Sequence, residues 1–363
     1  MGSLLMTGFP GFLGSALLPR LLARRSEDQA ICLVQAQHVP LAATRIKQIE
    51  AVHPHTRDRI TVVVGDITEQ GLGLDIADRA RLAEVREIWH LAAVYDLSVP
   101  EDVARRVNVE GTAHVLEFAI SHPTLERLNY VSTCYVSGDH PGLFAEDDLD
   151  VGQGFLNHYE ATKFEAEVLV RRAMRAGLPA TIFRPGVVVG DSRTGETQKY
   201  DGPYFLAAFL RRQPALAVVP AVGDPDEVRF GLVPRDYVID AMDALSAMDK
   251  SEGRTYALTD PHPPTARTLV DAFASYLGKR VTWVPLPLGA TRALLGGIPG
   301  LEKLLGLPAE GLDYFAYRTV HSTTNAVADL VGTGISCPTF TDYAGVLLDF
   351  MIAHPEYDSH AMI

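Results

Sequence analysis

The chain has 363 residues, of which 47% are hydrophobic, and a formal net charge of −13 at pH 7. This length and apolar fraction allow a large buried core, either in one large domain or in two smaller ones. The acidic balance argues against a nucleic-acid partner, because binding to a phosphate backbone depends on clustered Lys and Arg.

Short β-type runs alternate with helical patterns along most of the chain. Strands are predicted at residues 3–7, 30–35, 60–65, 87–91, 127–132, 180–184 and 255–259. Helices are predicted near residues 13–25, 40–52, 78–84, 101–121, 158–176, 203–212, 235–247, 265–277 and 340–353. This alternation predicts an α/β fold with a Rossmann-type doubly wound parallel sheet.

The pattern becomes less regular after Gly190, where GDSRTGETQKYDGP carries the turn-forming residues of an exposed loop. We therefore predict a main unit that carries the sheet and a smaller, discontinuous C-terminal region. The main unit comprises residues 1–190 with return segments at about 236–279 and 336–363. The smaller region comprises residues 191–235 and 280–335.

A glycine-rich turn, TGFPGFLG, joins the first predicted strand to the first helix. Gly8 permits a tight exit from the strand, Gly11 lets the backbone approach a pyrophosphate, and Gly14 lets the helix pack close to the sheet. Glycines also punctuate ordinary loops, but a position between a strand and a helix favours a dinucleotide site. The expected cofactor contacts in this turn are Thr7, Gly8, Gly11, Phe12, Leu13 and Gly14.

Two further segments follow strands where a bound nucleotide would be contacted. Asp66 can accept a hydrogen bond from an adenine amino group, or it can simply cap the next turn. Ala92 and Ala93 are small either because a ribose or phosphate passes nearby or because the core is tight. The expected contacts here are Asp66, Ile67, Leu91, Ala92 and Ala93.

The choice between NAD and NADP depends on the end of the second strand, which reads Gln35-Ala36-Gln37. No carboxylate stands there to repel a ribose phosphate, and Arg45 follows in the next helix. We therefore expect Gln35 and Arg45 to contact the cofactor and NADP to be preferred, with NAD still possible. The alternative is that Arg45 is an ordinary surface residue.

Tyr159 and Lys163 are four residues apart in a predicted helix, so both can face one cleft. A phenol has a pKa of about 10 in isolation, and a nearby cation lets it act as an acid or base closer to neutrality. Thr133 lies at the end of a strand, where open α/β sheets bind their ligands. Ser132 competes for the same role, but adjacent side chains in a strand point to opposite faces, so one of the two is structural.

These motifs resemble a known superfamily. TGFPGFLG, GDIT, HLAA, NVEGT, VSTCYVSG, YEATK and RPGVVVG, in this order and spacing, are similar to the extended short-chain dehydrogenase/reductases over about the first 245 residues. WHLAAVYDLSV, FLNHYEATKFEAE and RPGVVVGDSRTG resemble the thioester-reductase and fatty acyl-CoA reductase (male sterility) branch. In this comparison Gln35 stands where several reductase relatives carry Arg, which weakens the NADP assignment.

The resemblance implies site residues and a division of labour between the two regions. It implies a Thr133, Tyr159 and Lys163 triad, with Asn108 positioning a structural element near the site. Pro185, Gly186 and Val187 would border the nicotinamide. The main unit would then bind NAD(P) and the smaller region the substrate.

We therefore expect an NAD(P)-dependent oxidoreductase that reduces the carbonyl of an acyl thioester, an aldehyde or a ketone. The carbonyl oxygen would sit between Thr133 and Tyr159, with Lys163 on the nicotinamide ribose. Leucines of an apolar segment would line a hydrophobic substrate pocket or else form ordinary core. These leucines are Leu286, Leu288, Leu294, Leu295, Leu301, Leu304 and Leu305.

Two other functions use the same motifs. A nucleotide-sugar epimerase or dehydratase would share the triad and keep NAD tightly bound. A non-catalytic dinucleotide-sensing protein would need the glycine turn alone. An acyl carrier protein as partner and a homodimer both stay open.

The cysteines and the chain start favour a reducing compartment. Cys32, Cys134 and Cys337 form no CxxC pair, and no histidines have metal-ligand spacing, so we predict neither disulfides nor a metal. A predicted core strand follows Met1 almost at once, without room for a signal peptide. No apolar run reaches the roughly 18 residues of a membrane span. We therefore expect a cytoplasmic protein.

Overall fold

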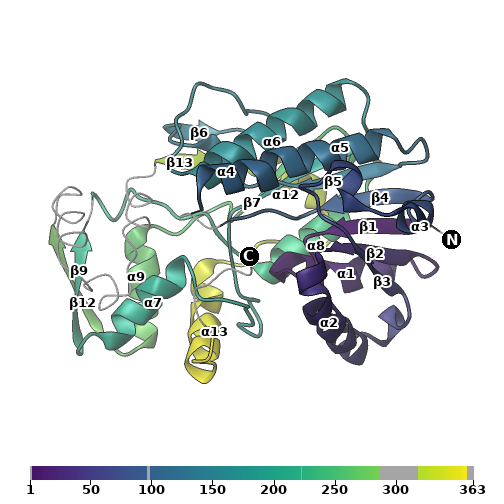
Figure 1. The fold of residues 1–363 in the computed structure, drawn as a ribbon. Coiled ribbons are helices and arrows are strands. Elements are labelled where there is room, and N and C mark those ends of the chain that lie inside the picture. The colour runs from purple at the N-terminus through teal and green to yellow at the C-terminus, as the bar shows by residue number, and fades with distance from the viewer. Residues whose placement is uncertain (1, 96–98, 222, 286–317, 358–363) are drawn as a thin grey trace.

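The computed structural model, which describes residues 2–95, 99–221, 223–285 and 318–357, is built around a seven-stranded sheet (Figure 1). All neighbouring strands are parallel, in the order β11-β7-β5-β4-β1-β2-β3. The strands are β1 (Ser3–Thr7), β2 (Gln29–Val34), β3 (Ile60–Val64), β4 (Val85–His90), β5 (Arg127–Val131), β7 (Ala180–Pro185) and β11 (Thr255–Leu258). The predicted doubly wound parallel sheet is confirmed, and each predicted strand is found within two residues of its expected bounds.

Helices cover both faces of this sheet (Figure 1). One face carries α4 (Glu101–Ala104), a π-helical turn (Arg105–Glu110), α5 (Gly111–Ile120) and α6 (His158–Arg175). The other carries α1 (Phe12–Arg24), α2 (Val39–Val52), α8 (Arg235–Ser246) and α12 (Thr324–Leu330), while the short α3 (Ile76–Arg81) precedes β4. The single helix predicted at 101–121 is therefore three consecutive pieces, and α12 was not predicted.

A second apolar cluster lies beside the sheet unit and is built from the later part of the chain. It contains α7 (Pro203–Arg212), α9 (Ala266–Tyr276) and α13 (Phe340–Ala353). The strands β9 (Leu216–Ala221) and β12 (Arg280–Pro285) pair in parallel next to these helices (Figure 1). Of the predicted return segments, α8 and β11 pack on the sheet unit, whereas α9 and α13 pack in the second cluster. The division into two regions stays a prediction.

Two short parallel pairs lie outside the main sheet. The strand β8 (Val187–Val189) pairs with β10 (Leu232–Pro234), and β6 (Gly142–Phe144) pairs with β13 (Thr319–His321). Each strand has three residues, too few to give a periodic pattern in the sequence. The leucine-rich segment expected to line a substrate pocket lies outside the described residues. No helix in the described ranges is both long and apolar enough to cross a membrane.

Candidate active site

The carboxyl ends of the strands form one edge of the sheet, and the predicted site residues gather there. The chain runs from β1 outward through β2 and β3, and then returns to place β4 on the other side of β1. In open parallel sheets this reversal of strand order leaves a crevice at the carboxyl edge, where ligands bind. Gln35, Thr133 and Gly186 all follow directly, or within two residues, the ends of strands at this edge.

The glycine turn after β1 is tightly packed against the end of β4. Gly8 has φ of 83°, and a Cβ atom there would lie 2.7 Å from the carbonyl carbon of Leu91. At Gly11 and Gly14, a Cβ atom would lie 2.7 Å from the carbonyl oxygen of Gly8. The three glycines are therefore needed for the turn itself. Contact of Gly11 with a pyrophosphate stays a prediction.

The start of α1 offers backbone donors at this turn. Gly11 is the N-cap residue, no side chain caps the helix, and its first turn contains no acidic residue. An uncapped helix N-terminus attracts anions through its N–H groups and the helix dipole. This arrangement fits the pyrophosphate of a dinucleotide next to Phe12 and Leu13.

A buried chain of hydrogen bonds joins the ends of β1 and β4. Thr7 Oγ1 lies 2.7 Å from His90 Nδ1 and accepts from the backbone N–H of Ala92 at 3.2 Å. His90 Nε2 lies 3.1 Å from Thr112 Oγ1. Burial, and secondarily the charge of Lys163, lowers the pKa of His90 to about 3, so the imidazole is neutral. The side chain of Thr7, a predicted cofactor contact, thus hydrogen-bonds within the protein.

Asp66, the predicted adenine contact, is engaged by protein groups. Its Oδ1 accepts from the backbone N–H of Thr68 at 2.8 Å and from the Thr68 hydroxyl at 2.9 Å, while Oδ2 accepts from Gln35 Nε2 at 2.7 Å. The turn-capping role, which was the alternative for Asp66, is therefore present in the structure. Ile67, which follows Asp66, is buried against Gly111.

Asn108 holds the loop after β4 onto α6. Its side-chain Nδ2 donates to the Val94 carbonyl and to Thr162 Oγ1, both at 3.0 Å, and its Oδ1 accepts from the Val94 N–H at 2.9 Å. Asn108 lies inside the π-helical turn, and such turns often occur at functional sites. Asn108 thus ties the loop after β4 to the helix that carries Tyr159 and Lys163, and its role in the site stays a prediction.

Thr133 and Ser132 point to different partners. Ser132 Oγ donates to Glu167 Oε2 at 2.6 Å within the core. The Thr133 side chain accepts from the backbone N–H of Tyr135 and hydrogen-bonds with the Tyr159 hydroxyl. Thr133 is thus the hydroxyl beside Tyr159, and Ser132 is a core residue. A catalytic role for Thr133 stays a prediction.

The helix α6 presents Tyr159 in its first turn. Asn157 caps the helix by accepting from the Glu160 N–H at 3.0 Å, and Glu160 in turn accepts from the Leu156 N–H at 3.0 Å. This reciprocal pair fixes where the helix begins. Burial raises the pKa of Tyr159 to about 12, although the hydrogen bond with Thr133 opposes the rise. In the protein alone the phenol is therefore protonated. We expected Lys163 to lower the pKa of Tyr159, but that pKa is raised.

Lys163 is buried one turn after Tyr159. Its Nζ donates to Tyr130 Oη and to the Val131 carbonyl, both at 2.9 Å, and the residue is 3% exposed. Burial lowers the pKa of Lys163 to about 7, while the carboxylate of Glu167 acts in the opposite direction. Lys163 Nζ is thus held against the end of β5.

The lowered pKa of Lys163 predicts a pH-dependent stability. Between about pH 7 and 10.5 the unfolded chain holds a proton on this lysine that the folded chain has lost, so its contribution to the free energy of unfolding rises with pH. The slope has an upper limit of about 1.4 kcal/mol per pH unit. Urea unfolding of cofactor-free protein between pH 7 and 9 should show this slope, and Lys163→Met should reduce it. Equal slopes in the two proteins would contradict the prediction.

Several residues of this site were missed in the sequence. Tyr130 hydrogen-bonds to Lys163, and Glu167 accepts from Ser132, the residue before Thr133. Each lies in a pattern typical of a buried strand or a helix surface. Among the described residues, no group of three or more His, Cys, Asp or Glu is arranged to hold a metal ion. Pro185, Gly186 and Val187 lie where β7 passes into β8, at the same edge as Thr133.

Comparison with known proteins identifies the family. Residues 6–242 match the male sterility protein family, whose domain binds NAD. The chain belongs to this family. It is 31% identical over 275 residues to the L-2-aminoadipate reductase large subunit of Eremothecium gossypii, covering 70% of this chain and 19% of that protein. It is 29% identical over 355 residues to an isonitrile lipopeptide synthase of Streptomyces coeruleorubidus, covering 92% and 23%.

Solved structures give the same assignment. The terminal R domain of the myxalamid PKS-NRPS pathway matches with a TM-score of 0.81 and 29% identity, covering 98% of this chain and 91% of that one. UDP-glucuronic acid 4-epimerase from Bacillus cereus, solved with NAD, shares the fold at a TM-score of 0.66 and 19% identity, covering 98% of each chain. The family member described here is an NAD(P)-dependent oxidoreductase of the extended short-chain dehydrogenase/reductase type. It spans about a quarter of the length of curated relatives it matches.

Proposed function

We propose that this domain reduces the carbonyl of an acyl thioester, with NADPH preferred over NADH, and that Thr133, Tyr159 and Lys163 carry the reaction. The observation that carries the proposal is the hydrogen bond between Thr133 and Tyr159 at the carboxyl edge of the sheet, with Lys163 buried one helical turn away. The choice of a thioester is supported by the likeness to a terminal R domain of a peptide-synthetase pathway. A thiolation or acyl carrier protein is the partner that would deliver such a substrate.

The residues present fit a dinucleotide. The uncapped start of α1 suits the pyrophosphate, and the tight turn at Gly8 keeps the backbone clear of bulky side chains. Pro185, Gly186 and Val187 would border the nicotinamide. When bound, the nicotinamide supplies the hydride for carbonyl reduction.

The side chains of the triad would polarise the substrate and move one proton. Thr133 Oγ1 and Tyr159 Oη both donate to the carbonyl oxygen, which stabilises the negative charge that it gains. Tyr159 then gives its proton to that oxygen, while Lys163 would bind the nicotinamide ribose. The raised pKa of Tyr159 keeps the proton on the phenol at neutral pH, as an acid in the reducing direction requires.

The test is oxidation of NADPH and NADH, followed by nicotinamide absorbance, with a chain-length series of acyl-CoAs and the matched aldehydes. We expect turnover of acyl-CoAs that disappears in the Tyr159→Phe protein. Turnover of aldehydes alone would confine the activity to aldehyde reduction. Cofactor binding without turnover of either class would contradict the proposal and favour ketone or nucleotide-sugar substrates.

Arg45 is the residue on which the NADP preference depends. It lies in α2, the helix after β2, and forms no hydrogen bond or ion pair with any described residue; its Nε is buried without a partner. An unpaired guanidinium matches a ribose phosphate in charge and geometry. Arg45→Ala should raise the KM for NADPH about tenfold, as loss of one charged hydrogen bond implies, and leave that for NADH unchanged.

The matched control for this variant is Lys47→Ala, which removes an exposed cation from the same helix. It should leave both KM values unchanged, because Lys47 stands two residues from Arg45 and thus on another side of the helix. If Arg45→Ala changes the KM for NADPH and the KM for NADH equally, Arg45 does not recognise the ribose phosphate.

A further inference from the structure

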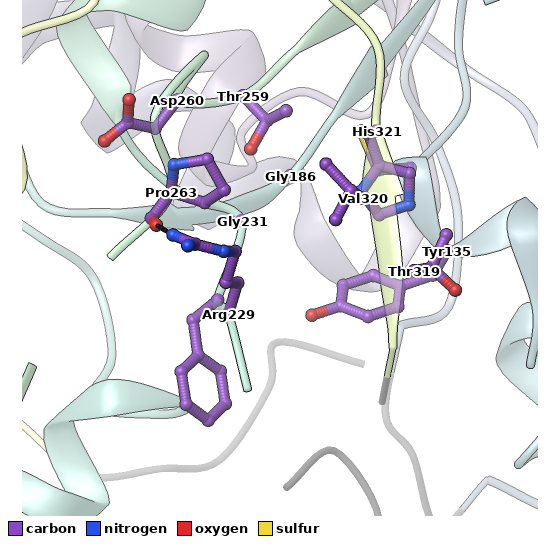
Figure 2. Close-up of a pocket in the computed structure, with 12 residues that line it drawn as sticks. Tyr135, Gly186, Arg229, Gly231, Thr259, Asp260, Pro263, Thr319, Val320 and His321 are labelled. Carbon is purple, nitrogen blue, oxygen red and sulfur yellow. Dashed lines mark hydrogen bonds between the residues drawn. The ribbon is translucent and has the colours of Figure 1, made fainter. Parts of the chain in front are cut away.

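A small pocket is lined in part by the residues that directly follow Thr133 and Pro185, and Figure 2 shows side chains that line it. We call it the side pocket and define it by six of its lining residues. These are Cys134, Tyr135, Gly186, Gly231, Thr259 and His321. Cys134 and Tyr135 directly follow Thr133 in the chain, and Gly186 follows Pro185, so segments that carry proposed site residues also line the pocket. None of the glycine-turn residues lines it.

Thr259 brings an unpaired hydroxyl to this pocket. The residue follows β11 and is 2% exposed, and its Oγ1 has no hydrogen-bond partner among the described residues. Leaving a buried hydroxyl unpaired costs about 1–3 kcal/mol, so native structures seldom keep one without a reason. A group that enters the pocket and bonds to Oγ1 would remove this cost.

Two glycines lie close to that hydroxyl. A Cβ atom at Gly186 would lie 2.7 Å from Thr259 Oγ1, and one at Gly231 would lie 2.9 Å from it. Any side chain at either position would therefore collide with Thr259. Glycine at both positions lets the two backbone segments pass close to Thr259 where they line the pocket.

The wall opposite Thr259 is also polar. Figure 2 shows His321 across the pocket from Thr259, with Gly186 and Gly231 labelled between them. His321 Nε2 lies 3.0 Å from Ser137 Oγ, and its Nδ1 would lie 3.9 Å from a Cβ atom at Gly231. Burial lowers the pKa of His321 to about 4, so the ring is neutral, and it hydrogen-bonds both to Ser137 and to the backbone of Cys134.

Asp260 adds a second acceptor next to Thr259. Its Oδ1 accepts from the His262 N–H at 2.8 Å, while its Oδ2 is buried and has no partner among the described residues. The pocket thus combines one unpaired carboxylate oxygen with one unpaired hydroxyl that can both donate and accept. This set matches a ligand hydroxyl, which also does both.

We infer that the side pocket binds a hydroxyl group on the acyl part of the substrate, close to the carbonyl that is reduced, and that Thr259 is the residue that recognises it. The inference rests on the proposed function, because that function places the carbonyl at Thr133. It adds a hydroxyl group to the hydrophobic substrate expected from the sequence.

The experiment compares NADPH-dependent reduction of octanoyl-CoA with that of each enantiomer of 3-hydroxyoctanoyl-CoA. We expect kcat/KM for one hydroxy enantiomer to exceed that for octanoyl-CoA by about tenfold, the effect of one good hydrogen bond. In Thr259→Val this ratio should fall to about one, while Thr259→Ser should keep it. Thr44→Val, which alters an exposed threonine of α2, is the control and should keep the ratio of the wild-type protein.

A stability measurement separates recognition from a structural role. Because Thr259→Val removes an unpaired buried hydroxyl, the cofactor-free variant should unfold at the same temperature as the wild-type protein or higher. A lower unfolding temperature would show that the hydroxyl supports the fold and would overturn the inference. Turnover of octanoyl-CoA without preference for either hydroxy enantiomer would also overturn it. Absence of turnover with every substrate would instead reject the proposed function.

Discussion

Tyr159→Phe is expected to lower kcat for carbonyl reduction by about 100- to 10,000-fold, the range for loss of one positioned proton donor. In the proposed reaction the phenol gives a proton to the substrate oxygen, next to Thr133 at the carboxyl edge of the sheet. Removing one oxygen leaves the ring and the cap of α6 in place. The Kd of NADPH, measured by fluorescence titration, should therefore stay close to the wild-type value.

The control for Tyr159→Phe is the same change at Tyr276, an exposed tyrosine of α9 in the second cluster that hydrogen-bonds to Asp349. Tyr276→Phe should retain full turnover. If Tyr159→Phe binds NADPH and still turns over at the wild-type rate, Tyr159 is not the proton donor.

The sheet was predictable because each of its strands lies between recognisable breaks in pattern. Glycine turns and apolar runs of four to six residues are local signals, so the β1 turn and the strands that follow could be placed within two residues. The pairs β8–β10 and β6–β13 depend on contacts between residues far apart in the sequence. Three-residue strands carry no period of their own, and only the folded chain reveals them.

The candidate site was predictable in part for a similar reason. Tyr159, Lys163 and Thr133 follow from helical spacing and from the end of a strand. The sequence could not decide between Thr133 and Ser132, because strand alternation says only that they face opposite ways; Glu167, which accepts from Ser132, separates them. Thr259 and His321 carry no local signal, because the side pocket is assembled from segments that meet only in the fold.

Glu167 is the centre of a buried charge network directly behind this site. Its carboxylate accepts from Arg184 Nη2 at 2.6 Å and from Arg171 Nε at 3.0 Å, as well as from the Ser132 hydroxyl. Glu167 is 0% exposed and Arg184 is 2% exposed. Burial alone would raise the pKa of Glu167, but Arg184 and the other donors hold it below its usual value. The carboxylate is therefore ionised at neutral pH and supports the fold there, and this contribution is lost in acid.

Glu167→Ala is expected to reduce the free energy of unfolding by about 3–5 kcal/mol. The loss is large because Arg184 would keep its charge in the core without a carboxylate to compensate it. The matched control is Glu165→Ala, two residues away on the same helix, where the side chain is exposed and pairs with Arg105 at 2.6 Å. An exposed pair of this kind contributes about 0–1 kcal/mol. Urea unfolding at pH 7 followed by circular dichroism measures both variants.

Glu167→Gln separates the charge from the hydrogen bonds of this network. The amide oxygen can still accept from one donor, but it no longer neutralises the two guanidinium groups, so the variant should fall between the wild-type protein and Glu167→Ala. The intermediate value would assign the stabilisation to charge and hydrogen bonding together. If Glu167→Ala is no less stable than Glu165→Ala, the charge network around Glu167 does not stabilise the fold. Ser132 donates to Glu167 and directly precedes Thr133. That result would therefore also mean that the network does not fix the position of Thr133.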